Sequence, residues 1–220
     1  MTQKIVAIIP ARGGSKGIPR KNLASLNGKP LLYYSVTACL NSYLVDETWV
    51  SSDDDEILEY ATSLGANVIK RPQSICKDTS SSESALLHLA DNVGFDTLLF
   101  VQATSPLVTV DIITSALCHY NNNKDLDSLV SGHIDHGFWW QSGQPLFDPI
   151  NRPTRQQQGD LYKESGMFYI TSRKALLESG CRYSGKAKIY PIDKMSALEI
   201  DTEEDLKLIE LIMRRRERDV

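Results

Sequence analysis

Short apolar runs alternate with helical patterns through the first seventy residues, and this order constrains the fold more than any other feature. Ile5–Pro10 is an apolar, β-branched run, which is typical of a strand buried on both faces. A helix is predicted from Pro30, which suits a first helical turn, to about residue 42. A second strand at Thr48–Ser51, a helix that stops at Gly65 and a third strand at Asn67–Lys70 follow. A β-α-β-α-β order implies an α/β fold with a parallel, doubly wound sheet and right-handed crossovers.

The loop after the first strand has the composition of an anion-binding site. Residues 11–22 read Ala-Arg-Gly-Gly-Ser-Lys-Gly-Ile-Pro-Arg-Lys-Asn. Glycine lets backbone N–H groups approach an anion closely, and positive charge comes from Arg12, Lys16, Arg20 and Lys21. A strand that ends in such a loop is suited to hold a triphosphate. The glycine spacing fits neither a Walker A loop nor the dinucleotide fingerprint, and on composition alone a basic surface loop is an equal alternative.

Length, charge and cysteine spacing limit the class of protein. A chain of 220 residues fits a single domain over 1–220, and its 41% hydrophobic and 24% charged residues are ordinary for a globular protein. The net charge of −4 argues against a nucleic-acid partner. No apolar run approaches a membrane span, and the first strand begins too early for a signal peptide. The four widely spaced cysteines favour reduced thiols in a cytoplasmic protein over disulfides or a zinc site.

The motif Ala-Arg-Gly-Gly-Ser-Lys-Gly-x-Pro-x-Lys-Asn, directly after a first strand, resembles the cytidylyltransferases that activate sialic acids and related nine-carbon acidic sugars. In that family the loop wraps the CTP phosphates. The resemblance extends over residues 5–205 and implies a Rossmann-like, mostly parallel sheet of the nucleotidyltransferase type. It also implies nucleotide contacts from Arg12, Gly14, Ser15, Lys16, Lys21 and Asn22.

A second resemblance to the family's cytidine pocket lies at Arg71-Pro72 and in the Asp-Thr-Ser-Ser-Ser run at 78–82. It implies that Arg71 contacts the base and that Ser82 lies near the base or ribose. As a bare sequence the same run is a well-capped helix start. The two interpretations are compatible, because a helix N-terminus offers hydrogen-bond donors to either a cap or a ligand.

The sugar-binding residues are implied by two partial matches. The polar loop after the apolar strand at 98–101 resembles a family loop, and Gln102 and Ser105 carry over as contacts to the acidic sugar. Ligands of open α/β sheets bind beyond the carboxyl ends of strands, so this loop should face the loop at 12–22. Arg155 and Gln156 match an Arg-Gln pair that approaches the sugar, and Lys163 retains the charge of another family arginine. An arginine suits a carboxylate because its N–H groups can bind both oxygens.

The aromatic run at 138–140 departs from the family pattern. The family has a lysine close to the sugar in this neighbourhood, and here Trp139 stands in its place. An aromatic wall at this point either lines the sugar pocket or packs the core. The departure leaves the identity of the acidic sugar open.

Two groups of polar residues favour ordinary structural roles over metal binding. The acidic run at 53–56 follows a strand and precedes a helix, where acids cap and stabilise the helix start. His133 and His136 have no cysteine and no third histidine nearby, so a plain loop is favoured.

Glu199 and Asp201 predict a magnesium site. They alternate on a predicted strand, so both carboxylates should point the same way. Two hard oxygen donors on one face can hold Mg²⁺ while phosphates and water complete its shell. The family often has Asp-Ile-Asp-Thr here, so the glutamate leaves open whether Glu199 is a direct ligand. Thr202 with Asp205 also forms a capping-box-like helix start.

The resemblance as a whole implies a nucleotidyltransferase that moves CMP from CTP to a nine-carbon 2-keto acid sugar of the sialic, legionaminic or pseudaminic acid type, releasing pyrophosphate. Catalysis is expected from Arg12, Lys16, Lys21 and Asp201, with Mg²⁺ as cofactor. Residues 172–190 resemble a small arm through which family members dimerise, which implies a homodimer. The alternatives are an enzyme for another acidic sugar, such as an eight-carbon 2-keto acid, and a non-catalytic protein that binds a nucleotide sugar.

Overall fold

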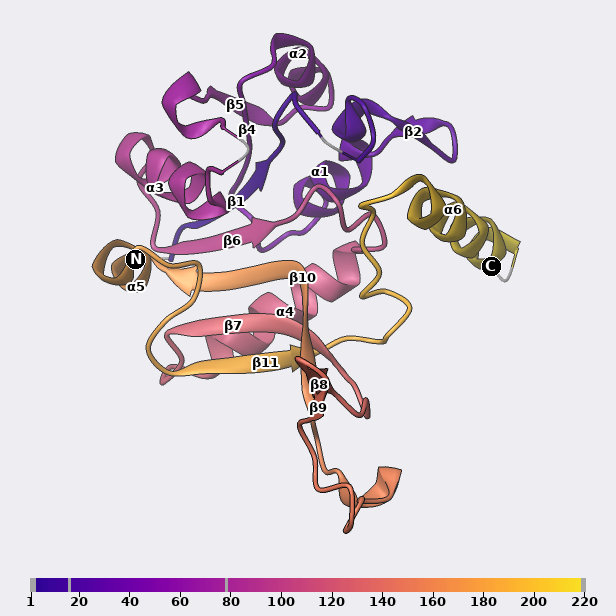
Figure 1. Ribbon diagram of the computed structural model, residues 1–220. Helices are drawn as coiled ribbons and strands as arrows, with labels where there is room; N and C mark the ends of the chain where they lie inside the picture. Colours follow the sequence, from indigo (N-terminus) through magenta and orange to yellow (C-terminus); the bar gives the residue numbers. More distant parts are fainter. Residues whose placement is uncertain (1–2, 16, 78, 219–220) are drawn as a thin grey trace.

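The chain folds around one mixed sheet with helices on both faces. The computed structural model describes residues 3–15, 17–77 and 79–218 (Figure 1). Within them a seven-stranded sheet has the order β11-β7-β10-β6-β1-β4-β5. Its strands are β1 (Ile5–Pro10), β4 (Glu47–Ser52), β5 (Asn67–Lys70), β6 (Thr97–Val101), β7 (Ser128–Ile134), β10 (Tyr162–Ser172) and β11 (Ala187–Pro191). All run in one direction except β10, which is antiparallel to both of its neighbours. The predicted doubly wound, mostly parallel sheet is confirmed.

The interior strand β1 explains why the sheet is covered on both sides. Successive strand residues face opposite sides, and here both sides are apolar. Ala7 and Ile9 pack with α1 (Leu32–Leu40), α2 (Asp55–Ser63) and α4 (Val110–Asn122). Val6 and Ile8 pack with α3 (Ser82–Asn92) and α5 (Arg173–Ser179).

The loop after β1 and the last helix pack together beside the sheet, while the two chain ends lie on opposite sides of the molecule (Figure 1). Pro30 lies not in a helix but in a small hairpin of β2 (Ser25–Leu26) and β3 (Lys29–Pro30), and α1 begins just after it. A third apolar cluster joins Ile18 and Leu26 to Ile200 and to Ile209 of the last helix, α6 (Glu203–Arg218). This packing holds the C-terminal acidic stretch against the N-terminal loop.

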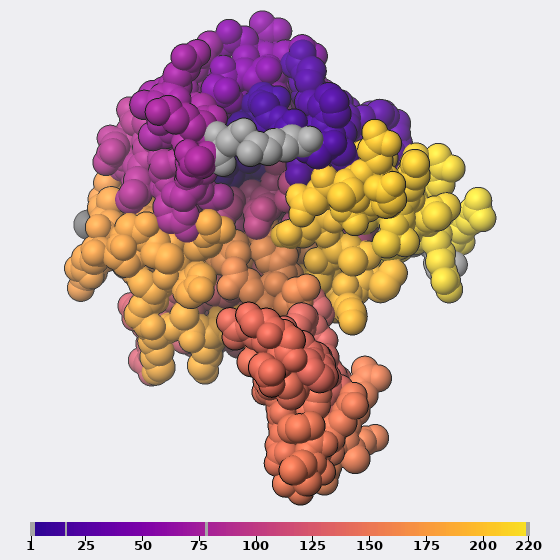
Figure 2. All heavy atoms as spheres, in the orientation of Figure 1, coloured from indigo at the N-terminus to yellow at the C-terminus, as the bar shows by residue number. Residues whose placement is uncertain are grey.

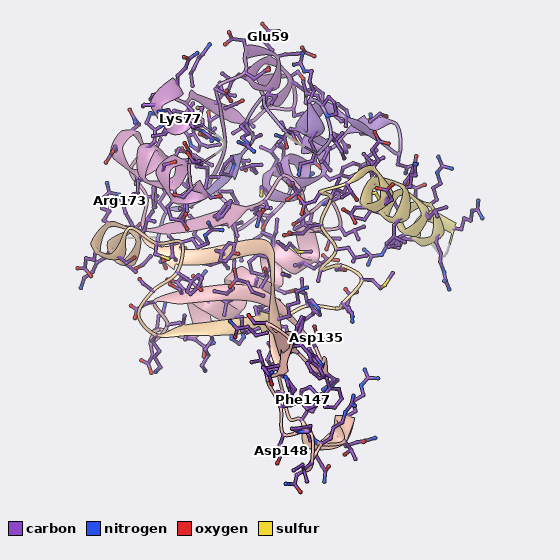
Figure 3. All side chains as sticks on the ribbon, in the orientation of Figure 1. Glu59, Lys77, Asp135, Phe147, Asp148 and Arg173 are labelled. Carbon is purple, nitrogen blue, oxygen red and sulfur yellow. The ribbon has the colours of Figure 1, made fainter. Side chains whose placement is uncertain are left out.

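A long segment projects from the body of the molecule. We call residues 135–161 the projecting loop, because its ends are joined by the hydrogen bond from Asp135 N to Leu161 O at 2.8 Å. Figures 2 and 3 show it as a narrow extension, with Asp135 near its base and Asp148 further out. It contains the short hairpin β8 (Trp140–Gln141) and β9 (Gln144–Pro145), and the turn η3 (Arg155–Gln157).

Residues 172–190, which the resemblance implied to be a dimerisation arm, pack into the body of the molecule. Leu176 of α5 is fully buried, and β11 pairs in parallel with β7 and so closes that edge of the sheet. The segment that projects is the loop at 135–161 instead. A role of residues 172–190 in dimerisation stays a prediction.

Three further features of the chain bear on the sequence analysis. The four cysteines are unpaired. No helix in the described ranges is long and apolar enough to span a membrane. Trp139 and Trp140 do not pack in the core, since both lie on the projecting loop and are about half exposed or more, at 47% and 61%.

Candidate functional site

A cleft of about 280 Å³ opens at the carboxyl ends of β1 and β6. It gathers residues from several distant segments that the sequence had singled out separately. Those that line it are Arg12, Gly14, Ser15, Lys21, Asn22, Arg71, Ser82 and Gln102. The expectation that the loop after β6 faces the loop at 12–22 is therefore confirmed. Lys16 lies outside the described residues.

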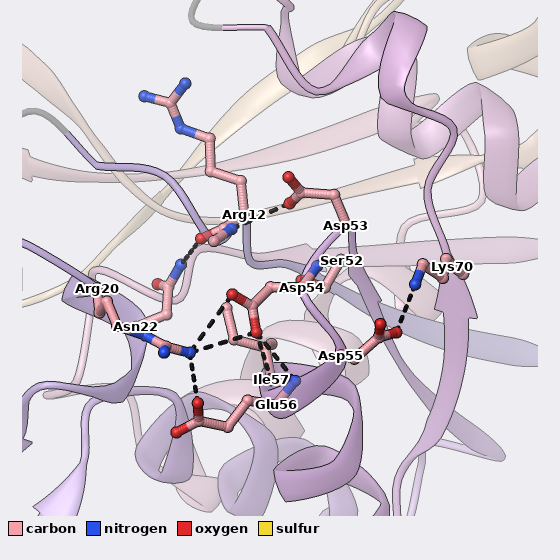
Figure 4. A network of polar contacts seen from close by, with 11 residues as sticks. Arg12, Arg20, Asn22, Ser52, Asp53, Asp54, Asp55, Glu56, Ile57 and Lys70 are labelled. Carbon is pink, nitrogen blue, oxygen red and sulfur yellow. Dashed lines mark hydrogen bonds and ion pairs between the residues drawn. The ribbon is translucent and has the colours of Figure 1, made fainter.

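Backbone and amide hydrogen bonds set the shape of the loop after β1 (Figure 4). The buried Asn22 donates from Nδ2 to the carbonyl oxygen of Arg12 at 2.9 Å. The amide N–H of Gly13 donates to Asp53 Oδ1 at 3.0 Å, which ties the loop to the end of β4. In Figure 4 the side chain of Arg12 extends away from Asp53. Asn22 thus has a structural task as well as a place in the cleft wall.

Arg20 does not contribute its charge to the cleft. Its guanidinium pairs with Glu56 at 2.8 Å and with Asp54 at 3.4 Å, at the start of α2. Asp54 itself caps α2 by accepting hydrogen bonds from the backbone of Glu56 and Ile57. The capping interpretation of the acidic run is confirmed.

Arg71 is fixed in the cleft wall by buried hydrogen bonds. Its Nη2 donates to the Ser51 carbonyl oxygen at 2.7 Å and its Nε to Ser51 Oγ at 3.2 Å. Burial lowers the pKa of the guanidinium below its usual value. Arg71 is therefore oriented before any ligand arrives, which suits recognition of a planar base.

The start of α3 differs from the sequence-based expectation. Ser81 is the N-cap residue, but its side chain makes no capping hydrogen bond. Ser80, Ser81 and Ser82 all line the cleft. A helix N-terminus without a side-chain cap keeps donors for a ligand, so the binding interpretation of this run is favoured over pure capping.

Lys21 joins the loop to the C-terminal acidic stretch. Its Nζ donates to the Ile200 carbonyl oxygen at 2.9 Å and pairs with Asp201 Oδ1 at 3.0 Å. Gly17 permits this approach, since a Cβ there would lie 2.3 Å from the backbone oxygen of Asp201. Residues 180 positions apart in the chain thus share one wall of the site.

The stretch at 199–201 is not the strand that we predicted. Its backbone makes one hydrogen bond to the backbone of another segment, from Ile200 N to Thr104 O at 2.9 Å. A single bond of this kind does not pair two strands, and no strand forms here. Ile200, between the two acids, is fully buried. Alternation around one buried residue was mistaken for a strand.

Glu199 is a partly buried carboxylate in the predicted metal pair. Burial, with the nearby charge of Asp201 as a second cause, raises the pKa of Glu199 to about 7. Its side chain accepts a hydrogen bond from Ser105, whose Oγ donates to Oε1 at 3.4 Å. Gly166, with φ of 72°, lets Glu199 approach β10, since a Cβ there would lie 2.3 Å from Oε1. Two hard oxygen donors, of which Asp201 influences the charge of Glu199, are the ligand type that a divalent cation prefers.

The remaining predicted sugar contacts fall in different places. Gln102 lines the cleft, whereas Ser105 is fully buried behind Glu199. Arg155 and Gln156 lie on the projecting loop, around a separate hollow with His136 and Asp160. The structure therefore does not bring Arg155 and Gln156 to the cleft of the same chain.

Several site residues escaped the sequence analysis. Ser80, Ser81 and Thr104 line the cleft, and Gly17 and Gly166 permit close approaches. The serines lay within a run that we had noticed, so extending the resemblance by two positions would have found them. No local signal marks the two glycines, because their neighbours come from distant parts of the chain.

The family model described as Cytidylyltransferase matches residues 6–218 of the chain. The chain belongs to this cytidylyltransferase family. Among described residues no group of three or more His, Cys, Asp or Glu side chains is placed to hold a metal alone.

The chain is similar in sequence to cytidylyltransferases that are named for acidic sugars. It is 37% identical over 216 residues to the N-acylneuraminate cytidylyltransferase of Oncorhynchus mykiss, covering 94% of this chain and 49% of the relative. It is 31% identical to the pseudaminic acid cytidylyltransferase of Campylobacter jejuni, covering 95% of this chain and 96% of the relative. The chain thus spans about half the length of the fish relative and nearly all of the bacterial one.

Solved structures agree on the fold. A CMP:2-keto-3-deoxy-manno-octonic acid synthetase complexed with CTP matches with a TM-score of 0.75, covering 97% of this chain and 99% of that chain, at 20% identity. The 4-diphosphocytidyl-2C-methyl-D-erythritol synthase of Anaerococcus prevotii matches with a TM-score of 0.71 at 14% identity, covering 96% of each chain.

Proposed function

We propose that the protein transfers CMP from CTP to a nine-carbon 2-keto acid sugar and releases pyrophosphate. The observation that carries this proposal is the convergence of separately predicted residues on one cleft at the carboxyl end of β1. Family membership and the relatives' names, which include N-acylneuraminate and pseudaminic acid, support the nucleotide and the class of sugar.

The nucleotide would lie along the cleft from α3 to Lys21. Arg71 and the serines at the start of α3 are placed to contact the cytidine, with Ser82 beside the base or ribose. Arg12, Ser15 and the backbone at Gly14 would bind the phosphates, and Lys16 belongs to the same loop. Lys21, held between this loop and Asp201, would face the phosphates at the reacting end.

The reaction is a substitution at the α-phosphorus of CTP. The anomeric hydroxyl oxygen of the sugar forms a bond to this phosphorus, the bond to the bridging oxygen of pyrophosphate breaks, and the hydroxyl proton is released. Arg12, Lys16 and Lys21 would stabilise the charge that develops on the departing pyrophosphate. Such transfers depend mainly on positioning and electrostatic stabilisation, which a preformed cationic loop supplies.

Asp201 and Glu199 would hold Mg²⁺, because both supply hard oxygen donors and stand two residues apart in the chain. The bound ion would neutralise negative charge on the phosphates. Gln102, at the edge of the cleft, would contact the sugar, and the buried Ser105 would hold Glu199 in place.

We also propose that the protein is a cytoplasmic homodimer. The projecting loop exposes large apolar side chains, among them Trp140, Leu146 and Ile150, which is 90% exposed. A second copy of the chain would cover them. Arg155 and Gln156 lie on the same loop, and so would stand at that interface. Sedimentation at micromolar concentration checks the dimer, and a monomer would refute it.

The unpaired cysteines suit a reducing compartment, which supports the cytoplasmic location.

The test is pyrophosphate release with CTP, Mg²⁺ and a panel of acids. The panel holds N-acetylneuraminate, legionaminate and pseudaminate types, and an eight-carbon 2-keto acid. Turnover with a nine-carbon acid is the expected result. Turnover with the eight-carbon acid alone would correct the sugar class, and CTP binding without turnover would favour a non-catalytic binding protein.

A further inference from the structure

The carboxyl end of β4 contacts both halves of the nucleotide cleft. The carbonyl oxygen of Ser51 accepts a hydrogen bond from the amide of Ala11, where the loop after β1 begins, at 2.9 Å. The same oxygen accepts from Arg71 Nη2 at 2.7 Å. A carbonyl oxygen has two lone pairs and can accept both bonds. One peptide group of β4 therefore joins the start of the phosphate-binding loop to the residue placed to contact the base.

The Ser51 side chain adds a further contact to Arg71. Its hydroxyl is fully buried and accepts from Arg71 Nε at 3.2 Å. The backbone amide of Arg71 also donates to the Ser52 carbonyl oxygen at 2.7 Å. A guanidinium is a planar fork, so bonds to two of its nitrogens fix the orientation of the plane. Ser51 thus sets the direction in which Arg71 presents its remaining N–H groups.

Asp53 and Asp54 are adjacent acids with different tasks. Asp54 caps α2 and pairs with Arg20. Asp53 Oδ1 instead accepts from the amide of Gly13 at 3.0 Å. In Figure 4 the two carboxylates are directed to different sides, Asp53 to the loop after β1 and Asp54 to the start of α2. Helix capping therefore explains Asp54 and does not explain Asp53.

The hydrogen bond to Asp53 holds the loop from outside the cleft. Arg12 and Gly14 line the cleft, whereas Gly13 between them does not. A Cβ on Gly13 would lie 2.7 Å from Asp54 Oδ2 and 2.8 Å from Asp54 Cβ, so this approach requires glycine. The residues on either side of Gly13 are thus left to face a ligand, while its own amide anchors the loop to β4.

The charge of Asp53 suits a place between two arginines. Burial lowers the pKa of Arg71, the like charge of Arg12 lowers it further, and the opposite charge of Asp53 acts against both. Asp53 therefore offsets the repulsion between the two guanidinium groups. A carboxylate would repel phosphates, so a role in holding the loop accounts for Asp53 better than direct contact with the nucleotide.

We propose that Ser51 and Asp53 are positioning residues for CTP, an inference that rests on the proposed function. Ser51 would orient Arg71 toward the base, and Asp53 would hold the loop where the outer phosphates bind. Neither side chain lines the cleft. The end of β4 would thus keep the base-binding and phosphate-binding halves at a fixed separation before the nucleotide arrives, which lowers the cost of ordering them on binding.

The experiment measures Kd for CTP and for CMP by isothermal titration calorimetry. D53A should raise Kd for CTP about tenfold and Kd for CMP less than about twofold, because CMP lacks the outer phosphates. D53N keeps an oxygen that can accept from the Gly13 amide, so its Kd for CTP should stay within about threefold of the unchanged protein. D55A is the matched control, since Asp55 pairs with Lys70, and it should change neither value.

Ser51 has a different signature, because it acts on the base. S51A should raise Kd for CTP and for CMP by the same factor, about three- to tenfold, and should reduce the preference for CTP over UTP by a similar factor. S52A is the matched control. Ser52 is also fully buried, but its hydroxyl accepts from the amide of Asp54, and S52A should leave the preference for CTP unchanged.

These ratios separate positioning from stability, since an unfolded fraction raises the apparent Kd for every nucleotide equally. Three results would overturn the inference: a CMP-to-CTP ratio in D53A equal to that in D55A, a loss in D53N as large as that in D53A, or an unchanged preference for CTP in S51A. In each case CTP binding by the unchanged protein would still support the proposed function. An unchanged protein that binds no CTP refutes the proposed function, and this inference with it.

Discussion

Replacing Lys21 with alanine should separate activity from stability. The Lys21 side chain is only 14% exposed, and its ammonium joins the phosphate-binding loop to Asp201 and Ile200. In the proposed reaction it also faces the departing pyrophosphate. Removing one preorganised electrostatic donor typically costs about 100- to 1000-fold in kcat. We expect K21A to fall in this range.

The cost of K21A to folding is smaller. Its ionic partner Asp201 is 73% exposed, and an exposed pair contributes about 0–1 kcal/mol. The hydrogen bond to the Ile200 carbonyl oxygen adds about 1 kcal/mol. For a chain of this size the sum corresponds to a fall in Tm of roughly 2–8 °C. The variant should therefore be folded at 25 °C and nearly inactive.

Arg20 supplies the matched control, because it carries the same charge one position earlier in the loop. Its guanidinium pairs with Glu56 and Asp54 and does not line the cleft. R20A should keep kcat within about threefold and lose at most about 1 kcal/mol of stability. Steady-state pyrophosphate release and thermal melts on both variants test the reasoning. Equal kcat losses in R20A and K21A would refute it, since general loop charge would then explain the effect.

G166A should lower the free energy of unfolding, measured by urea titration, by more than about 2 kcal/mol. G159A, at a similar φ but in open space, should lower it by about 1 kcal/mol. Equal losses in the two variants would exclude the close contact between Gly166 and Glu199. The hydrogen bond from Arg182 holds the pKa of Glu83 below its usual 4.5, so this pair stabilises the fold above that pH and the contribution is lost as pH falls through the lower value. E83Q should therefore be about 1–2 kcal/mol less stable than the unchanged protein at pH 7 and nearly equal to it near pH 3, a difference that a pH series of melts measures. D201N should abolish turnover with a far-UV circular dichroism spectrum like that of the unchanged protein, and retained activity would remove Asp201 from the mechanism.

The first half of the fold could be predicted because its signals are local. The run at Ile5–Pro10 is continuous and apolar, and the loop after it carries a long, specific motif. Arg71 and Ser82 were likewise found from short matches, and the structure brings both to the cleft. These features depend on residues close together in the chain.

What could not be predicted depends on pairing between distant segments. The strand at 187–191 is short and partly polar, and only its register with β7 identifies it as an edge strand of the sheet. Gly166 matters only because Glu199 approaches it, thirty-odd residues further along the chain. No window of sequence contains these contacts.

The most direct test of the account is the identity of the product formed from CTP and a nine-carbon 2-keto acid. Mass spectrometry should find a CMP-sugar conjugate in equal amount to the pyrophosphate released, and no conjugate when the sugar is omitted. Free CMP without conjugate, or pyrophosphate release that does not depend on the sugar, would contradict the assignment of this cleft to CMP transfer.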